Sequence, residues 1–256
     1  MANRFLNYQW KGKSKHGVHS PFVYDLITEV FENKTPYYCY EEIEKRRFLL
    51  EKSDKTIQVT DFGAGSHVNN NKTRKVSDIA KNAAKPKKFA QLLFRLVNRF
   101  QPQNIVELGT SLGLTSLYLA NANTKSKLYT FEGCPETAQI ARGIFQKYPC
   151  HNIEQIIGNF DQTYLEFLER SLTIDFAFFD GNHRKEPTLR YFYDSLPFKT
   201  ESSVFIFDDI HWSDEMREAW EEIKKHPEVT VTIDLFFIGL VFFKKDQAKE
   251  DFVIKF

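Results

Sequence analysis

Along residues 104–225, short runs of apolar residues alternate with stretches in which apolar positions recur every three or four residues. The short runs have the pattern of buried strands, and the longer stretches have that of amphipathic helices. We expect strands at residues 105–108, 127–132, 153–157, 174–180 and 203–208. We expect helices at residues 114–120, 136–147, 162–170, 188–195 and 214–225. Strands that alternate with helices predict an α/β fold in which helices cover both faces of a parallel sheet.

The pattern changes near the C-terminus. Residues 229–236 and 240–244 are both strand-like, and only a short turn at Ile238-Gly239 separates them. Two strands joined by so short a turn form a hairpin, so the last strand runs antiparallel to its partner. The predicted fold class is a doubly wound, Rossmann-like α/β sheet that is mostly parallel, with an antiparallel C-terminal hairpin strand.

The first part of the chain is mainly helical in pattern. Ser20-Pro21 has the form of a helix start, with serine as the N-cap and proline in the first turn. Further helices are expected at residues 41–50 and from Pro86 to Phe100, and a strand at residues 56–62. We therefore predict an N-terminal helical extension or lid over residues 1–85 and a second domain over residues 86–256.

Composition narrows the class of protein. Hydrophobic residues make up 42% of the chain and charged residues 27%, which is ordinary for a globular protein. No window approaches a membrane span, and the N-terminus has no apolar signal region. Cys39, Cys134 and Cys150 form no C-x-x-C pair, which indicates reduced thiols. A cytoplasmic location without membrane partners is expected.

Charge is distributed unevenly, although the net charge is only +1. Residues 1–100 hold 19 Lys and Arg against 10 Asp and Glu, and the remainder holds 16 against 24. A basic first part and an acidic second part suggest two functional faces. Solvated lysines on helix surfaces explain the same distribution.

Acidic residues follow most of the predicted parallel strands. Strand ends carry Glu107, Glu132, Asp180 and the Asp208-Asp209 pair, and another predicted strand ends in Gly158-Asn159. Ligands of open parallel sheets bind outside the carboxyl ends of the strands. Core packing alone does not predict acids at so many of these ends, so we expect the site here.

The turn after Glu107 contains Gly109 and Gly113 and leads into a helix, an arrangement that lets backbone N–H groups face a ligand. Glu132 lies 23 residues beyond Gly109, at the distance where an acid binds the ribose hydroxyls of a nucleoside. Dinucleotide sites need a middle glycine, and this turn has Ser111 there. The extra carboxylate of Glu107 suits a cationic ligand, and S-adenosylmethionine is a nucleoside with a sulfonium, an ammonium and no phosphate.

The motifs E-L-G-T-S-L-G, D-G-N-H and D-D-I-H-W, the acid Glu132 and the terminal hairpin together resemble class I S-adenosylmethionine-dependent methyltransferases. The resemblance is closest to small-molecule O-methyltransferases, of the catechol type and of those that act on macrolide sugars. It covers roughly residues 86–245. The resemblance implies cofactor contacts at Glu107, Gly109, Thr110, Ser111, Gly113, Glu132, Gly133, Gly158, Asn159, Phe160 and Asp180.

The carboxylates of Asp180, Asp208 and Asp209 are expected to converge, because they follow strands that are neighbours in this fold. Three such groups repel one another unless a proton or cation is shared, and oxygen ligands suit Mg²⁺. In the enzymes that these residues resemble, such a metal orients the substrate hydroxyls. The alternative is that Asp180 meets the cofactor's ammonium and Asp209 caps the next helix.

The D-G-x-H pattern makes His183 the candidate general base, with Asp180 beside it as the second catalytic residue. His211 is a weaker candidate, and Trp212 is expected to pack or to line the acceptor pocket. Catechol-type enzymes have asparagine at the second position of the Asp208-Asp209 pair and lysine at Gly181. These departures favour the D-G-x-H subgroup.

Two further functions remain open. The basic run from Lys72 to Lys88 is compatible with an RNA methyltransferase, although D-G-N-H stands where base-modifying enzymes carry N-P-P-Y-like residues. The other is a cofactor-binding protein without catalysis. We expect the glycine-containing loop from Asp61 to Ser66 to be a structural turn or substrate-side loop, not a second cofactor loop. The sequence does not specify the methyl acceptor. It is compatible with several oligomeric states, one of which is a homodimer.

Overall fold

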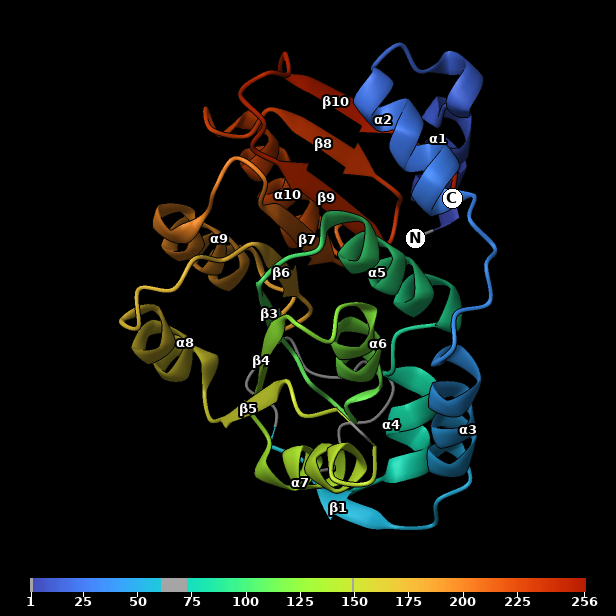
Figure 1. Ribbon diagram of the computed structural model, residues 1–256, viewed down its shortest axis with the longest axis vertical. Coiled ribbons are helices and arrows are strands. Elements are labelled where there is room, and N and C mark those ends of the chain that lie inside the picture. The colour runs from blue at the N-terminus through green and yellow to red at the C-terminus, as the bar shows by residue number, and fades with distance from the viewer. Residues whose placement is uncertain (1, 61–72, 149) are drawn as a thin grey trace. The chain divides into compact units, whose positions relative to one another are not determined.

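The computed structural model describes residues 2–60, 73–148 and 150–256 (Figure 1). The chain forms two compact units. We call Thr35–Ser171 the central unit, and Met1–Lys34 together with Leu172–Phe256 the terminal unit. Each unit contains its own strands and helices and is described in turn.

The central unit contains a parallel three-stranded array in the order β3-β4-β5. Its strands are β3 (Asn104–Leu108), β4 (Lys127–Glu132) and β5 (Ile153–Ile157). Its alternating helices are α5 (Lys87–Phe100), α6 (Leu114–Ala122), α7 (Pro135–Phe145) and α8 (Phe160–Leu168). The apolar stripe of α5 is buried, and α5 packs on α6. All of these elements were predicted, and their bounds agree within a few residues.

A smaller layer precedes α5 in the central unit. It consists of α3 (Tyr40–Glu51), β1 (Thr56–Gln58), β2 (Thr73–Lys75) and α4 (Val76–Asn82). Strands β1 and β2 pair antiparallel. The helix predicted at residues 41–50 is confirmed as α3, whereas β2 and α4 were not predicted. The predicted strand from residue 56 is only three residues long where it is described, and the loop Asp61–Ser66 lies outside the described residues.

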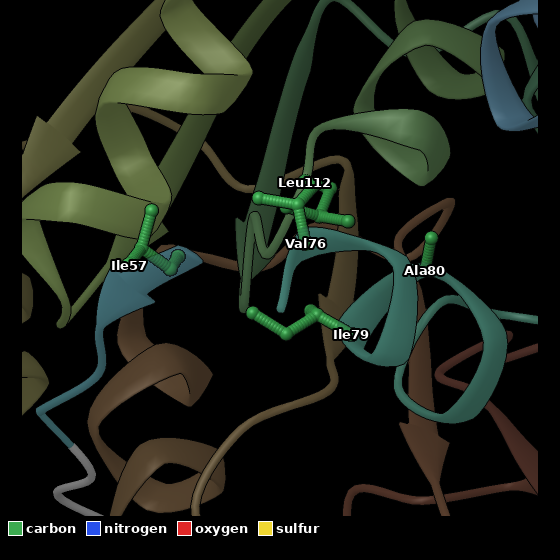
Figure 2. Packing of buried hydrophobic residues seen from close by; sticks show 5 residues of the cluster. All are labelled: Ile57, Val76, Ile79, Ala80 and Leu112. Atoms are coloured by element: carbon green, nitrogen blue, oxygen red, sulfur yellow. The ribbon is translucent and has the colours of Figure 1, made fainter. Parts of the chain in front are cut away.

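This layer packs against the turn between β3 and α6. Leu112, from that turn, is buried against Ile57 of β1 and against three residues of α4, as Figure 2 shows. The α4 residues are Val76, Ile79 and Ala80. Burial of a leucine side chain stabilises a fold by about 1.5–3 kcal/mol. The layer therefore supports the conformation of the glycine-containing turn.

The terminal unit contains five strands in the order β10-β8-β9-β7-β6. They are β6 (Phe176–Phe179), β7 (Val204–Asp208), β8 (Val231–Asp234), β9 (Ile238–Phe242) and β10 (Glu250–Val253). Strands β6 and β7 are parallel, and β9 runs antiparallel to both β7 and β8. The predicted C-terminal hairpin is confirmed, but its turn lies at residues 235–237, and Ile238 and Gly239, the expected turn, are the first residues of β9. The parallel strand β10 beside β8 was not predicted.

Helices α9 (Lys185–Ser195) and α10 (Asp214–Lys225) pack on each other in the terminal unit, with a 3₁₀ turn at Leu196–Phe198 after α9. The indole of Trp220 on α10 occupies the space above Gly239. A Cβ at that glycine would lie 2.6 Å from the ring. Glycine is therefore required at the start of the return strand so that α10 can approach the hairpin.

The N-terminal residues of the chain cover this C-terminal hairpin (Figure 1). They form α1 (Ala2–Lys11), a 3₁₀ turn (Lys15–Gly17) and α2 (Pro21–Leu26), which continues as a π-helical stretch (Ile27–Phe31). The predicted cap is confirmed, because Ser20 Oγ accepts a hydrogen bond from Val23 N. Phe22 contacts Phe242 of β9 edge-on. None of the helices in the described part of the chain is both long and apolar enough to cross a bilayer.

Candidate functional site

Glu107 lies in the middle of a buried polar group in the central unit. Its side chain has no exposed surface, and its Oε2 accepts hydrogen bonds from Ser116 Oγ at 2.5 Å and Thr130 Oγ1 at 2.6 Å. Its Oε1 has no hydrogen-bond partner among the described residues. Burial raises the pKa of Glu107 to about 7. A buried carboxylate oxygen without a donor is costly, so it indicates a place for a cationic or hydrogen-bonding ligand.

The turn after β3 turns its backbone amides toward β4. The N–H groups of Gly109 and Thr110 both donate to Phe131 O, at 3.0 and 2.9 Å. Ser111 has a φ of 48°, a left-handed conformation that is uncommon for serine, and its N–H donates to Glu132 Oε2 at 2.8 Å. Ser111, which stands where dinucleotide sites have a middle glycine, therefore binds Glu132, the acid predicted to recognise ribose.

Glu132 is held by two backbone amides. Its Oε2 accepts from Ser111 N, and its Oε1 accepts from Cys134 N at 2.9 Å. Both carboxylate oxygens are thus fixed by the backbone, and a carboxylate oxygen can accept more than one hydrogen bond. Gly133, in the bend between these two contacts, is half-buried. A carboxylate with a fixed orientation suits a pair of neighbouring hydroxyl groups.

The end of β5 supplies the third part of this edge. Gly158 has a φ of 145°, and its N–H donates to Glu132 O at 3.0 Å. Asn159 is the N-cap of α8, and its Oδ1 accepts from Asp161 N at 3.1 Å. Phe160 is the half-buried first residue of α8. The predicted cofactor residues of the central unit thus lie at the carboxyl ends of three adjacent parallel strands.

In the terminal unit, Asp180, His183 and Asp208 come together. Each offers one ligand atom, and these atoms all lie within 4.8 Å of one another. Asp180 follows β6 and Asp208 ends the neighbouring parallel strand β7, so the sheet itself brings the two carboxylates together. Asp208 is only 1% exposed.

His183 lies between two carboxylates. Its Nε2 is 3.7 Å from Asp180 Oδ1, and its Nδ1 is 3.9 Å from Asp209 Oδ2. The expected set of three aspartates is therefore arranged as two aspartates and this histidine, with Asp209 on the other side of the imidazole. His183 and Asp209 have φ values of 46° and 53°, and Asn182 one of 71°. Such strain in non-glycine residues is concentrated at functional sites.

The donor set fits a divalent cation. Carboxylates suit Mg²⁺ and Mn²⁺, and an imidazole suits transition-metal ions such as Fe²⁺ and Zn²⁺, so the mixed set is compatible with several divalent cations. Opposite ligands of a six-coordinate ion with bonds of about 2.1 Å lie about 4.2 Å apart. Atoms within 4.8 Å of one another reach that geometry after a small contraction.

The pairing of His211 with Asp234 was not predicted from the sequence. The Nε2 of His211 lies 2.6 Å from Asp234 Oδ2, and its ring stacks on Phe236 with centroids 5.1 Å apart. Trp212 beside it is 42% exposed. Asp234 could have been found from the sequence, because it is an acid at the end of an apolar strand, as are Glu132 and Asp208.

Comparison with known proteins shows which fold and which domain model the chain resembles. Residues 106–210 match the family model described as a methyltransferase domain. No curated protein matches the chain. The O-methyltransferase TomG of Streptomyces achromogenes, which is involved in tomaymycin synthesis, was solved with S-adenosylmethionine. It is similar with a TM-score of 0.55 and 23% identity, over 63% of this chain and 82% of that one.

Two similar structures contain S-adenosylhomocysteine. The O-methyltransferase of Bacillus cereus has a TM-score of 0.55 and 20% identity, over 86% of this chain and 97% of that one. The methyltransferase PaMTH1 of Podospora anserina has a TM-score of 0.61 and 13% identity, over 89% of this chain and 98% of that one.

The chain therefore has the Rossmann-like fold seen in class I S-adenosylmethionine-dependent methyltransferases, and residues 106–210 are similar to a methyltransferase domain. Within that class, the solved structures to which it is similar include O-methyltransferases. The predicted resemblance to O-methyltransferases is confirmed at the level of the fold.

Proposed function

We propose that this protein transfers a methyl group from S-adenosylmethionine to an oxygen of a small-molecule acceptor. The observation that carries the proposal is the Ser111–Glu132 contact, which presents a fixed carboxylate at the end of β4 beside a glycine turn. O-methyltransferases of the same fold that were solved with S-adenosylmethionine or S-adenosylhomocysteine support it.

In this proposal the central unit binds the cofactor. Glu132 accepts hydrogen bonds from the ribose hydroxyls, and the turn from Gly109 to Gly113 holds the methionine part. Glu107 compensates the cofactor's positive charge, because its buried Oε1 has no partner among the described residues. Gly158, Asn159 and Phe160 border the adenine.

The terminal unit prepares the acceptor. We propose that Asp180, His183 and Asp208 hold a divalent cation, which would lower the pKa of an acceptor hydroxyl and orient it. Asp209 faces His183 Nδ1 and fixes the orientation of the imidazole, so Nε2 faces Asp180. Without an ion, the same Nε2 is placed to accept the hydroxyl proton, and Asp180 stabilises the imidazolium that results.

Calorimetry with S-adenosylhomocysteine tests the cofactor site. We expect the wild-type protein to bind, and Glu132→Ala to bind at least about tenfold more weakly, because a charge-assisted hydrogen bond is worth about 1.5–3 kcal/mol. Glu166→Ala is the matched control, since Glu166 is exposed on α8 and bonds only Gln162 among the described residues. Absence of binding by the wild-type protein would exclude the proposed cofactor. Turnover in an acceptor screen with Mg²⁺, repeated with EDTA, separates the ion-assisted route from the His183 route.

An RNA acceptor is the second candidate, and one feature favours it. Lys75, Lys81 and Lys87 are exposed and form no ion pair with any described residue. Several lysines elsewhere form ion pairs, as in Lys185–Glu218 and Lys199–Glu228. An RNA affinity that falls steeply with salt would support this candidate.

The remaining sequence predictions stay proposals. The three cysteines form no disulfide and two of them are buried, which supports the expected cytoplasmic location. A functional division into a helical extension at residues 1–85 and a catalytic domain at residues 86–256 is tested by deletion. A homodimer is tested by the mass of the protein in solution.

A further inference from the structure

The loop after β7 begins with a strained residue. Asp208 is the last residue of β7, and Asp209 follows with a φ of 53°. Trp212 N donates to Asp209 O at 2.9 Å and closes the turn. A non-glycine residue stays in this conformation only where its surroundings impose it. Two residues further along the loop, His211 contacts two other elements of the terminal unit.

The side chain of His211 is tied to the C-terminal hairpin. His211 Nε2 lies 2.6 Å from Asp234 Oδ2, at the end of β8. The other oxygen, Asp234 Oδ1, accepts from Phe236 N at 2.7 Å, so the carboxylate is itself fixed by the hairpin turn. The ring of Phe236, only 2% exposed, covers the imidazole.

The backbone of the same loop is tied to the N-terminal helix. Arg4 of α1 donates from Nη1 to His211 O at 3.1 Å, and its Nη2 bonds Asp214 Oδ1 at 2.6 Å. Phe5 and Tyr8, also from α1, contact Phe236. The loop is thus held on its backbone side by α1 and on its side-chain side by Asp234.

We propose that His211, held by Asp234, is a positioning residue for the carboxylates of Asp208 and Asp209. It touches neither reacting atoms nor cation. It maintains the turn in which Asp209 lies 3.9 Å from His183 and Asp208 stays within the ligand cluster. This inference rests on the proposed function, in which that cluster binds a divalent cation.

Titration with Mn²⁺ alone tests the inference. We expect Asp234→Ala to weaken Mn²⁺ binding by about tenfold or more, the usual effect of removing a group that orients metal ligands. Asp234→Asn keeps an acceptor for Phe236 N and a polar partner for the imidazole, so it should restore most of the affinity. Thr232→Val is the matched control. It removes another short hydrogen bond of β8, which Thr232 Oγ1 donates to Asp251 Oδ1 at 2.6 Å. That bond joins β8 to β10 and does not involve the loop after β7.

Hydrogen exchange at residues 209–212 provides a metal-free measurement. We expect faster exchange of these amides in Asp234→Ala and His211→Ala, and wild-type exchange in Thr232→Val. Unchanged exchange, or Mn²⁺ affinity lost equally in Asp234→Ala and Thr232→Val, would overturn the positioning role. If the wild-type protein bound no Mn²⁺, the cation assignment of the proposed function would fail, and the exchange measurement would still decide the role of His211.

Discussion

Glu107 combines full burial with a charge that the fold compensates only in part. Ser116 and Thr130 both bond its Oε2, and no described residue bonds its Oε1. The register of the sheet sets Thr130 of β4 directly beside Glu107 of β3. In the proposed function, the positive charge of a bound cofactor would compensate this acid, because desolvation of a carboxylate is otherwise unfavourable.

The raised pKa of Glu107 predicts a pH-dependent stability of the cofactor-free protein. The folded state holds the proton up to about pH 7, whereas the unfolded chain releases it near pH 4.5. The folded state therefore binds more protons between these values, and its free energy of unfolding falls as the pH rises through them. The free energy of unfolding falls by about 3 kcal/mol over this range. Urea denaturation of wild type and Glu107→Gln at pH 5 and pH 8 measures it.

Glutamine keeps an acceptor for Ser116 and Thr130 but carries no charge, so the variant should lack this component of the pH dependence. Its stability relative to wild type should therefore be greater at pH 8 than at pH 5. Parallel stability profiles for the two proteins would show that Glu107 does not titrate in this range.

At the scale of elements, the glycine turn leads into α6 at Gly113, where the backbone lies close to α7. Gly113 has a φ of 80°, and a Cβ there would lie 2.7 Å from the ring of Phe145. We expect Gly113→Ala to lower the free energy of unfolding by at least about 1–2 kcal/mol, the cost of a left-handed conformation for alanine, and to weaken S-adenosylhomocysteine binding. Thermal melts and calorimetry measure the two effects.

Gly143 provides the control for this prediction. It lies within α7, and a Cβ there would meet no atom within 4 Å. Gly143→Ala should therefore stabilise the helix by about 0.4–1 kcal/mol and leave cofactor binding unchanged. Equal effects of the two alanines would contradict the role given to the turn.

The alternation of strands and helices could be predicted because each buried strand carries its own apolar run. Strands β2 and β10 could not, because their stability comes from pairing with distant strands. Residues Thr73–Lys75 are exposed or half-buried and pair with β1, and Phe252 is the buried hydrophobic residue within β10. Local sequence contains no period-2 pattern in such short elements.

The candidate site was also predictable in part, because strand-end acids can be read from the local sequence and their partners cannot. Acids at strand ends mark an edge of a sheet, so Glu107, Glu132, Asp180 and Asp208 were identified. The partners that fix them were not, because Asp234 meets His211 only through the hairpin and the Ser111 amide meets Glu132 only through the turn. Side-chain pairing across a fold depends on register, which spacing along the chain does not specify.

At the scale of the whole molecule, the chemistry is divided between the two units. The central unit carries the glycine turn and Glu132, and the terminal unit carries Asp180, His183 and Asp208. In the proposed function, methyl transfer would need both sets, since the first would hold the methyl donor and the second would activate the acceptor oxygen. Each set should nevertheless bind its own ligand, because the proposed function assigns Asp180, which the sequence also predicted as a cofactor contact, to the cation alone.

Hydrogen exchange on the intact chain tests this division. We expect S-adenosylhomocysteine to slow exchange mainly at residues 105–117 and 131–134, and Mn²⁺ to slow it mainly at residues 180–184 and 208–212. A ligand that binds only the folded state stabilises the segments that it contacts, by about 2.7 kcal/mol at a concentration 100 times its Kd. Glu132→Ala should remove the first protection and keep the second, and Asp180→Asn should do the reverse. Loss of both protections in either variant would show that the two ligand sites are not independent.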